Sequence, residues 1–410
     1  MPQDNLLLGL DIGTTKVCAV IGQYNENHIL EITGVGMYPS RGMRRGVIVN
    51  IEATVKSIIQ AIEAAEMMAG HEVDTATVGI SGPHIEGINS RGVVAVTGRG
   101  REIYKEDVDR VIDAAKAIVV PMDRAILHII PQEFIVDDQP GIKNPVGMMG
   151  VRLEAEVHII TGAISAAQNI LKSVNRAGFR VNELILEGLA ASRAVLSQDE
   201  KELGVLLVDL GGNSTNILSH LEGAPYHTSI LNIGADQVTS DLSIILKTPL
   251  ESAEKIKREA GACHFDCISE DEHVLIPRVG GRPPEKVSRR KIVEIIQPRM
   301  EEIFKLIKER VEVDGQLKRF GGGVVIVGGG ALLPGTLELA TEVFELPVRI
   351  GLPQGLGGLI EEYSSPVYAT AVGLVISAAR KEEGQDLTGG RKERGPGVLT
   401  KVKEWFKEFF

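Results

Sequence analysis

The sequence predicts a two-lobed α/β fold, because one strand–turn–strand pattern occurs twice and a glycine-rich turn follows a third strand. The first copy occupies residues 6–21 (LLLGLDIGTTKVCAVI), and the second occupies residues 205–218 (VLLVDLGGNSTNIL). In each copy an apolar run ends at an aspartate, small residues follow, and a second apolar run begins. The third strand, in residues 324–333 (VVIVGGGALL), runs into three glycines. The repeat predicts two similar lobes that face one ligand from opposite sides.

The turn of the first copy contains residue types that suit a phosphate group. Gly13 lets the backbone approach a ligand closely and adopt dihedral angles that other residues avoid. Thr14 and Thr15 offer hydroxyl groups, Lys16 offers a positive charge, and successive backbone N–H groups can form an anion-binding nest. A plain hairpin turn is the alternative interpretation of the same residues.

The turn of the second copy predicts a matching set of groups in the other lobe. Asp11 and Asp209 end the two strands, where they are expected to hold a Mg²⁺ ion through its water shell. The residues expected to bind phosphate in this turn are Gly211, Gly212, Asn213 and Ser214.

Three consecutive glycines and one helical ion pair form a third candidate set. The strand that runs into Gly328, Gly329 and Gly330 favours close passage of the backbone over an adenine or a ribose. Glu254 and Lys257 are three residues apart on a predicted helix and share a face, where they can bracket the nucleoside. An exposed ion pair is the competing interpretation.

Glu187 precedes small residues in the segment 182–197 (NELILEGLAASRAVLS). In a two-lobed nucleotide-binding fold such a segment connects the lobes beneath the phosphates, where Glu187 would position or polarise a water molecule. Glu187 and Asp209 are therefore the candidate catalytic residues. A carboxylate that stabilises a helix N-terminus through the helix dipole is the alternative for Glu187.

Composition limits the class of protein and its partners. The 410 residues are 43% hydrophobic and 24% charged, which is typical of a soluble globular protein with two or more domains. The formal net charge of −11 provides no basic footprint for nucleic acid. Three cysteines are few, as expected in a reducing cytoplasm. No apolar run approaches the ~18 residues that would predict a transmembrane helix.

Residues 83–162 are expected to form a self-contained α+β insert. Residues 151–160 alternate apolar and polar side chains, which predicts a strand in a sheet with one solvated face. Such a face suits contact with a neighbouring molecule, and a subdomain without a contact role is the alternative. The polar side chains of this strand are Arg152, Glu154, Glu156 and His158.

Residues 288–311 are expected to form a long, charged helix. Arg289, Arg290 and Arg299 concentrate positive charge there, although the protein is acidic. A solvated helix face explains this pattern, and a binding site for an acidic peptide is the alternative.

The C-terminal residues differ in character from the rest of the chain. Residues 381–397 are rich in glycine and charge and predict a flexible linker. Residues 398–410 predict an amphipathic helix with cationic flanks and the single tryptophan of the chain, which suits an anionic membrane surface. A helix that folds back onto its own domain is the alternative. The residues expected to enter the membrane are Val398, Leu399, Val402, Trp405, Phe406, Phe409 and Phe410.

The two phosphate turns and the glycine cluster, in this order, resemble the fold shared by actins, the 70-kDa heat-shock chaperones and sugar kinases. That fold is an actin-like two-lobe ATPase built from duplicated ribonuclease H-like domains. With the insert and the tail helix added, nearly the whole chain resembles the FtsA family of bacterial cell-division proteins. The resemblance implies binding of ATP and Mg²⁺ with at most slow ATPase activity, and self-assembly into filaments.

The resemblance also implies the partners. It implies that the chain anchors the tubulin-like division protein FtsZ to the cytoplasmic membrane at the division site, supports Z-ring assembly and engages other division proteins. The FtsZ C-terminal tail, which is acidic and apolar, would bind near Arg289, Arg290 and Arg299. No nucleic-acid partner is expected.

The resemblance further implies a division of the chain into subdomains. The expected parts are 1–82, 163–200 and 364–380 for the first lobe, 83–162 for the insert, 201–239 and 312–363 for the core of the second lobe, 240–311 for its upper subdomain, 381–397 for the linker and 398–410 for the membrane helix.

Three other classes share the expected fold. A rod-shape filament scaffold lacks the insert. A type IV pilus assembly protein shares the insert, but it is recruited by a peptide of another protein and does not need a strong tail helix. A small-molecule kinase would need a carboxylate base aimed at a substrate hydroxyl, and Glu187 or Asp209 would have to serve as that base.

Overall fold

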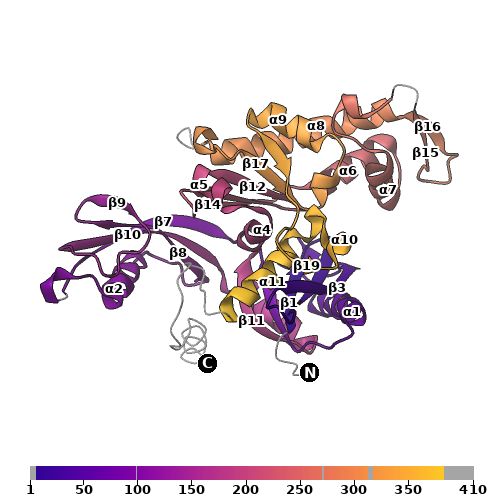
Figure 1. Ribbon diagram of the computed structural model, residues 1–410. Coiled ribbons are helices and arrows are strands. Elements are labelled where there is room, and N and C mark those ends of the chain that lie inside the picture. Colours follow the sequence, from indigo (N-terminus) through magenta and orange to yellow (C-terminus); the bar gives the residue numbers. More distant parts are fainter. Residues whose placement is uncertain (1–5, 98, 270–271, 313–316, 383–410) are drawn as a thin grey trace.

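The computed structural model describes residues 6–97, 99–269, 272–312 and 317–382. Three sheets dominate this part of the chain. Figure 1 shows the sheet of the first lobe below, the sheet of the second lobe above it, and a smaller sheet that projects to the left. The helix α4 (Glu187–Val195) lies between the two lobes, and α11 (Ala369–Glu382) packs against α4 and the sheet of the first lobe.

The sheet of the first lobe has six strands in the order β11-β6-β1-β2-β3-β19. β1 and β2 form an antiparallel hairpin around the first predicted turn, and β6 pairs with β1 in parallel. The helix α1 (Ile51–Ala69) covers one face; it begins at Asn50, whose side chain accepts a hydrogen bond from the N–H of Ala53. The strands are β1 (Leu6–Ile12), β2 (Lys16–Tyr24), β3 (Leu30–Pro39), β6 (Thr75–Ile80), β11 (Arg180–Leu186) and β19 (Gly357–Gly358).

The sheet of the second lobe repeats this arrangement in the order β14-β13-β12-β17-β18. β12 and β13 form an antiparallel hairpin around the second predicted turn, and β17 pairs with β12 in parallel. The two lobes thus share strand order and direction around the two predicted turns, as the sequence repeat predicted. The strands are β12 (Val205–Leu210), β13 (Thr215–Leu221), β14 (Ala224–Leu231), β17 (Val324–Val327) and β18 (Val348–Ile350).

Glycine allows the central helices to approach the first sheet and each other. A Cβ atom on Gly9 would lie 2.3 Å from the carbonyl oxygen of Ala371, so β1 and α11 pack closely. A Cβ atom on Gly373 would lie 1.8 Å from the carbonyl oxygen of Ala190, so α11 and α4 do the same. This packing fixes α4, and with it Glu187, against the core of the first lobe.

The second lobe carries most of the remaining helices. Its longest helix, α8 (Arg289–Val311), begins at Ser288, whose side chain accepts a hydrogen bond from the N–H of Lys291, and continues past Pro298. Further helices and strands here are α5 (Gln198–Leu203), α6 (Ala235–Leu246), α7 (Leu250–Ala260), α9 (Thr336–Phe344), β15 (His273–Ile276) and β16 (Glu285–Ser288). The short helix α10 (Ile360–Tyr363) packs on the first lobe, where Tyr363 joins the core.

The projecting sheet belongs to the insert and has the order β7-β10-β8-β9. The helix α2 (Lys105–Ala115) covers one face, over a core that includes Val111, Leu153 and Val157. The helix α3 (Ile164–Arg176) follows where the chain returns to the first lobe. The strands are β7 (Glu86–Ala95), β8 (Arg124–Val136), β9 (Gln139–Ile142) and β10 (Arg152–Ala163).

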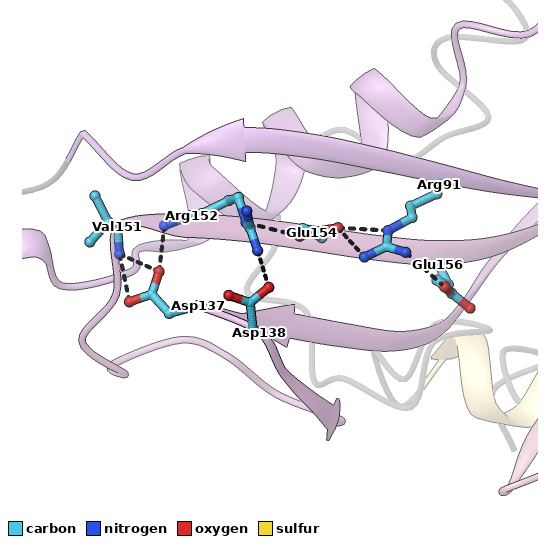
Figure 2. Close-up of polar contacts among 7 residues, drawn as sticks. All are labelled: Arg91, Asp137, Asp138, Val151, Arg152, Glu154 and Glu156. Carbon is cyan, nitrogen blue, oxygen red and sulfur yellow. Dashed lines mark hydrogen bonds and ion pairs between the residues drawn. The ribbon is translucent and has the colours of Figure 1, made fainter.

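The opposite face of this sheet is not the solvated face that the alternation in residues 151–160 predicted. Glu154 is only 5% exposed, because the side chains of Arg91 and Arg152 flank it in the charged row that Figure 2 shows. His158 is only 1% exposed, because it lies under β14, where its Nε2 is 2.8 Å from Thr228 Oγ1. The alternation correctly identified the strand, but the second lobe covers part of its polar face.

Candidate functional site

The two predicted turns lie against each other, although they belong to different lobes. A Cβ atom on Gly212 would lie only 2.3 Å from Cγ2 of Thr15, so the turns come this close only because Gly212 has no side chain. A hydrogen bond also crosses between the lobes, from Ser81 Oγ, which follows β6, to Asn216 Oδ1 at 2.5 Å. The two turns therefore form one site.

The first lobe contributes an ion pair to this site. Lys16 Nζ lies 3.1 Å from Asp11 Oδ2 and donates a second hydrogen bond to the carbonyl oxygen of Val367 at 3.0 Å. Burial by itself would lower the pKa of Lys16, but the charge and hydrogen bond of Asp11, together with the charges of its other neighbours, outweigh it and the pKa is raised. Lys16 is therefore a permanently charged cation at the end of the first hairpin.

One amide of the second lobe holds two carboxylates, that of Asp209 in the second lobe and that of Glu187 on α4. Asn216 Nδ2 donates to Glu187 Oε2 at 3.1 Å and to Asp209 Oδ2 at 3.2 Å. Burial, reinforced by the charge of Asp11, raises the pKa of Asp209 to about 6. Burial, reinforced by the charges of Asp11 and Asp209, raises the pKa of Glu187 well above its ordinary value. Three carboxyl groups thus share one lysine, and the site is short of positive charge.

The predicted glycines leave backbone atoms accessible around these carboxylates. A Cβ atom added to Gly13 would lie 2.9 Å from the carbonyl oxygen of Lys16. A Cβ atom added to Gly211 would lie 2.8 Å from the carbonyl oxygen of Ser214. A Cβ atom added to Gly328, which has a φ of 84°, would lie 2.4 Å from Asp209 Oδ1. Gly329 faces open space. The glycine cluster after β17 therefore reaches the carboxylates of the same site.

A small cavity lies between the lobes at these turns. Its volume is about 30 Å³, and Gly13, Thr14, Glu187 and Ser214 are part of its wall. A larger cavity, of about 340 Å³, lies between α8 and α9; its wall contains neither predicted turn and is mostly charged. Of the residues predicted to bind phosphate, Gly13, Thr14 and Ser214 therefore line the smaller cavity.

The predicted nucleoside residues connect two helices of the second lobe. Lys257 Nζ lies 2.7 Å from Glu254 Oε2 and donates a hydrogen bond to Thr239 Oγ1, on α6, at 2.8 Å. Lys257 is buried, so this ion pair is not an ordinary surface pair. The pair holds α7 against α6, beside the second turn, where Asn213 Nδ2 donates to Asp236 Oδ2 at 2.5 Å.

The arginines predicted to bind a peptide already have partners in the chain. Arg299 on α8 binds Asp241 on α6 through two of its nitrogens, at 2.6 and 3.2 Å. Arg289 pairs with Glu272, and Arg290 lies over the ring of Phe265 at 5.4 Å. The predicted membrane residues in 398–410 lie outside the described residues.

Sequence reasoning missed the residues that join the two lobes, chiefly Asn216 and Ser81. The hairpin register pairs Asp209 with Asn216, so extending the strand pairing beyond the turn would have placed Asn216 beside the carboxylate. Ser81 follows β6, which is parallel to β1 and ends at the same edge of the sheet. No local signal identified it.

The site fits a hydrated cation better than a directly bound one. Within the described ranges, no three His, Cys, Asp or Glu side chains converge as direct metal ligands. The excess of carboxylates nevertheless favours a cation, and Mg²⁺ usually keeps several of its waters in proteins. No helix in the part of the chain that the structure describes is long and apolar enough to cross a membrane.

Comparisons with known proteins identify the family. Residues 82–161 match the family described as SHS2 domain inserted in FTSA, and residues 206–373 match Cell division protein FtsA. The chain is 48% identical to Cell division protein FtsA of Borreliella burgdorferi over 410 residues, covering 99% of both chains. The chain belongs to the FtsA family of cell-division proteins. This family membership confirms the resemblance inferred from the phosphate turns, the insert and the tail.

Solved structures of lower identity share the fold of this FtsA-family chain. A PilM–PilN type IV pilus biogenesis complex matches with a TM-score of 0.66 and 17% identity, covering 92% of this chain and 99% of that chain. MreB5 of Spiroplasma citri bound to ADP matches with a TM-score of 0.56 and 14% identity, covering 93% of this chain and 99% of the MreB5 chain. The fold is the predicted actin-like two-lobe fold with an inserted α+β subdomain.

Proposed function

We propose that this FtsA-family chain binds one ATP, with Mg²⁺, between its two lobes. The observation that carries the proposal is the contact between Thr15 and Gly212, which brings both glycine-rich turns to one site. Backbone N–H groups and hydroxyls of the turns would bind the phosphates. These residues are Gly13, Thr14, Thr15 and Lys16 in the first lobe and Gly211, Gly212, Asn213 and Ser214 in the second.

The carboxylates would have separate roles in this complex. Asp11 and Asp209 would hold the water shell of Mg²⁺, which neutralises phosphate charge when it is bound. Glu187 would orient a water molecule near the terminal phosphate. Burial and the neighbouring carboxylates raise the pKa of Glu187 well above its ordinary value, which would make its carboxylate a better acceptor for a proton of that water.

The nucleoside would lie against the second lobe. Gly328, Gly329 and Gly330 would line its path, because Gly329 faces open space beside Asp209. Glu254 and Lys257 would flank the ribose and the adenine from α7. Because the present cavity holds only about a water molecule's volume, we expect the side chains that line it to rearrange when ATP enters. The structure of MreB5 bound to ADP, which shares this fold, supports nucleotide binding by this chain.

The proposal includes self-assembly and a membrane anchor on the cytoplasmic face at the division site. Residues 398–410 would lie in the membrane surface, and many such helices along a filament would bind more tightly than one. The filament would tether FtsZ, support Z-ring assembly and engage other division proteins. The expected division into lobes, insert, upper subdomain, linker and tail stays part of the proposal.

The upper subdomain, 240–311, would bind the FtsZ tail. Apolar side chains exposed there suit the apolar part of that peptide, and Arg289, Arg290 and Arg299 suit its carboxylates. Asp241 already occupies Arg299, so a peptide carboxylate would have to share or displace it. Exposed apolar residues there include Ile244, Ile245, Leu250 and Leu275.

Three measurements test the parts of this proposal. Calorimetric titration of the full chain with ATP and Mg²⁺ should show binding, and no binding would reject the nucleotide site. Co-sedimentation with anionic liposomes should require residues 398–410, and unchanged pelleting of a truncated chain would reject the anchor.

The third measurement is titration of an FtsZ tail peptide against Arg299→Glu, which should weaken binding. Lys305→Glu is the matched control, because Lys305 lies on the same helix and pairs with Glu301. Equal affinity of both variants would reject the role of Arg299.

Phosphorylation of a sugar or acid by the purified chain would favour the small-molecule kinase instead.

A further inference from the structure

A turn next to the phosphate site carries an arginine in an unfavourable backbone conformation. β4 (Met43–Arg44) and β5 (Val47–Ile48) form a short hairpin, and Arg45 and Gly46 make its turn. Both residues have positive φ, 50° and 73° respectively, as in a type I′ turn. Asparagine, aspartate and glycine are favoured in such turns, whereas a long side chain is disfavoured. The hairpin itself therefore gives no reason for an arginine at this position.

The turn is attached to the first lobe at two points beside the phosphate site. The N–H of Gly46 donates a hydrogen bond to Thr14 Oγ1 at 3.2 Å, which ties the turn to the first phosphate loop. A Cβ atom on Gly46 would lie 2.9 Å from Cα of Gly82, next to Ser81. Met43 and Gly46 also form part of the cavity wall, together with Glu187. Arg45 is thus adjacent in sequence to a residue that lines the site.

The charges of the site call for a further cation. Asp11, Asp209 and Glu187 surround it, and its lysine, Lys16, is already bound to Asp11. ATP would add more negative charge than one Mg²⁺ neutralises. Arg45 is exposed, and it makes no hydrogen bond or ion pair with any residue that the structure describes.

We infer that Arg45 binds the terminal phosphate of the nucleotide and makes the site prefer ATP to ADP. This inference rests on the proposed ATP site and deepens it. The hairpin forms the wall of the cavity beside Glu187, which is the side proposed for the terminal phosphate. A guanidinium group matches two phosphate oxygens at once, which lysine does not do.

The test compares nucleotide affinities of the full chain and an Arg45→Gly variant. Glycine removes the guanidinium and also relieves the positive φ, so the variant should fold at least as well as the parent. Arg101→Gly is the matched control, because Arg101 is an exposed arginine with a φ of 65° in the insert, outside the cavity wall. Arg45→Lys keeps the positive charge but removes the guanidinium group, so it tests whether ATP affinity needs the two-pronged hydrogen bonding or only the charge.

The expected result is a loss of ATP affinity of about 10- to 100-fold in Arg45→Gly, with ADP affinity within about twofold of the parent. Arg45→Lys should recover only part of the loss, and Arg101→Gly should bind both nucleotides like the parent. An ATP-to-ADP preference that Arg45→Gly leaves unchanged overturns this inference alone. No ATP binding by the unaltered chain would overturn the proposed function as well.

Discussion

Thr15 and Gly212 touch across the two lobes, because Cγ2 of Thr15 occupies the space in which a Cβ atom of residue 212 would lie, 2.3 Å away. The contact joins the phosphate turns of two hairpins that repeat each other in strand order and direction. It explains why neither turn alone is a complete site. It also makes the approach of the lobes sensitive to a single methyl group.

Gly212→Ala should therefore weaken ATP binding by about 10-fold or more, because the added methyl group pushes the turns apart. Calorimetric titration with ATP and Mg²⁺ measures the change. The double variant Gly212→Ala with Thr15→Ser should recover part of the affinity, because serine lacks the methyl group that clashes. Equal affinity of the parent and the single variant would show that the contact has no role in binding.

Asp209 should make the nucleotide-free protein less stable as the pH rises. Burial raises its folded-state pKa from 3.8 to about 6, so the folded state binds the proton more tightly than the unfolded state. Stability from this group is present below the unfolded pKa and is lost as the pH rises through about 6. Asp209→Asn should therefore stabilise the nucleotide-free chain near pH 7.5 by on the order of 1–3 kcal/mol, and much less near pH 4.

Denaturant unfolding of both proteins at the two pH values measures this difference. Glu251→Gln, at an exposed carboxylate on α7, is a control for a general carboxylate effect. A gain from Asp209→Asn that is the same at both pH values would contradict the shifted pKa. The variant should also lose Mg²⁺-dependent ATP binding.

Gly87→Ala should loosen the contact between the insert and the second lobe. The new Cβ atom would lie 2.8 Å from Cε1 of His158 and 2.9 Å from Cβ of Thr228, between β10 and β14. We expect a loss of about 1–3 kcal/mol in unfolding free energy and faster proteolysis within the insert. Ile88→Ala, one residue along β7, is the control, and an equal effect of the two variants would argue against the contact.

Glu154 should matter more for stability than its neighbour Glu156. Glu154 is buried between Arg91 and Arg152, whereas Glu156 is more exposed and lies 3.8 Å from Arg91 (Figure 2). Glu154→Gln should cost about 1–3 kcal/mol, because it weakens charge-assisted bonds to both arginines. Glu156→Gln should cost less than about 0.5 kcal/mol in the same thermal or denaturant unfolding assay. Equal costs would show that burial of Glu154 adds nothing.

The hairpins and their turns could be predicted from sequence because their signals are local. Residues 6–21 and 205–218 each contain both strands of a hairpin, so apolar runs and small turn residues located Asp11, Asp209 and the glycines between the strands. The strand of residues 151–160 was identified by its alternation for the same reason.

Contacts between distant segments had no such signal. Thr228 lies 70 residues after His158 and belongs to the other lobe, so the alternation in β10 left His158 on a face that the sequence predicted to be solvated. Arg299 and its partner Asp241 are 58 residues apart, so the sequence could not show that this arginine is already occupied. Asn216 lies in the second hairpin, but it can be placed beside Asp209 only once the pairing register of β12 and β13 is known.

The central claim is that one ATP binds between the two turns and touches both lobes. Titration of the full chain with ATP and Mg²⁺, repeated on Lys16→Ala and Gly212→Ala, tests it most directly. We predict one ATP per chain and a large loss of affinity from either change, since each alters a different lobe of one site. Full affinity in either variant, or two independent ATP sites in the unaltered chain, would contradict the claim.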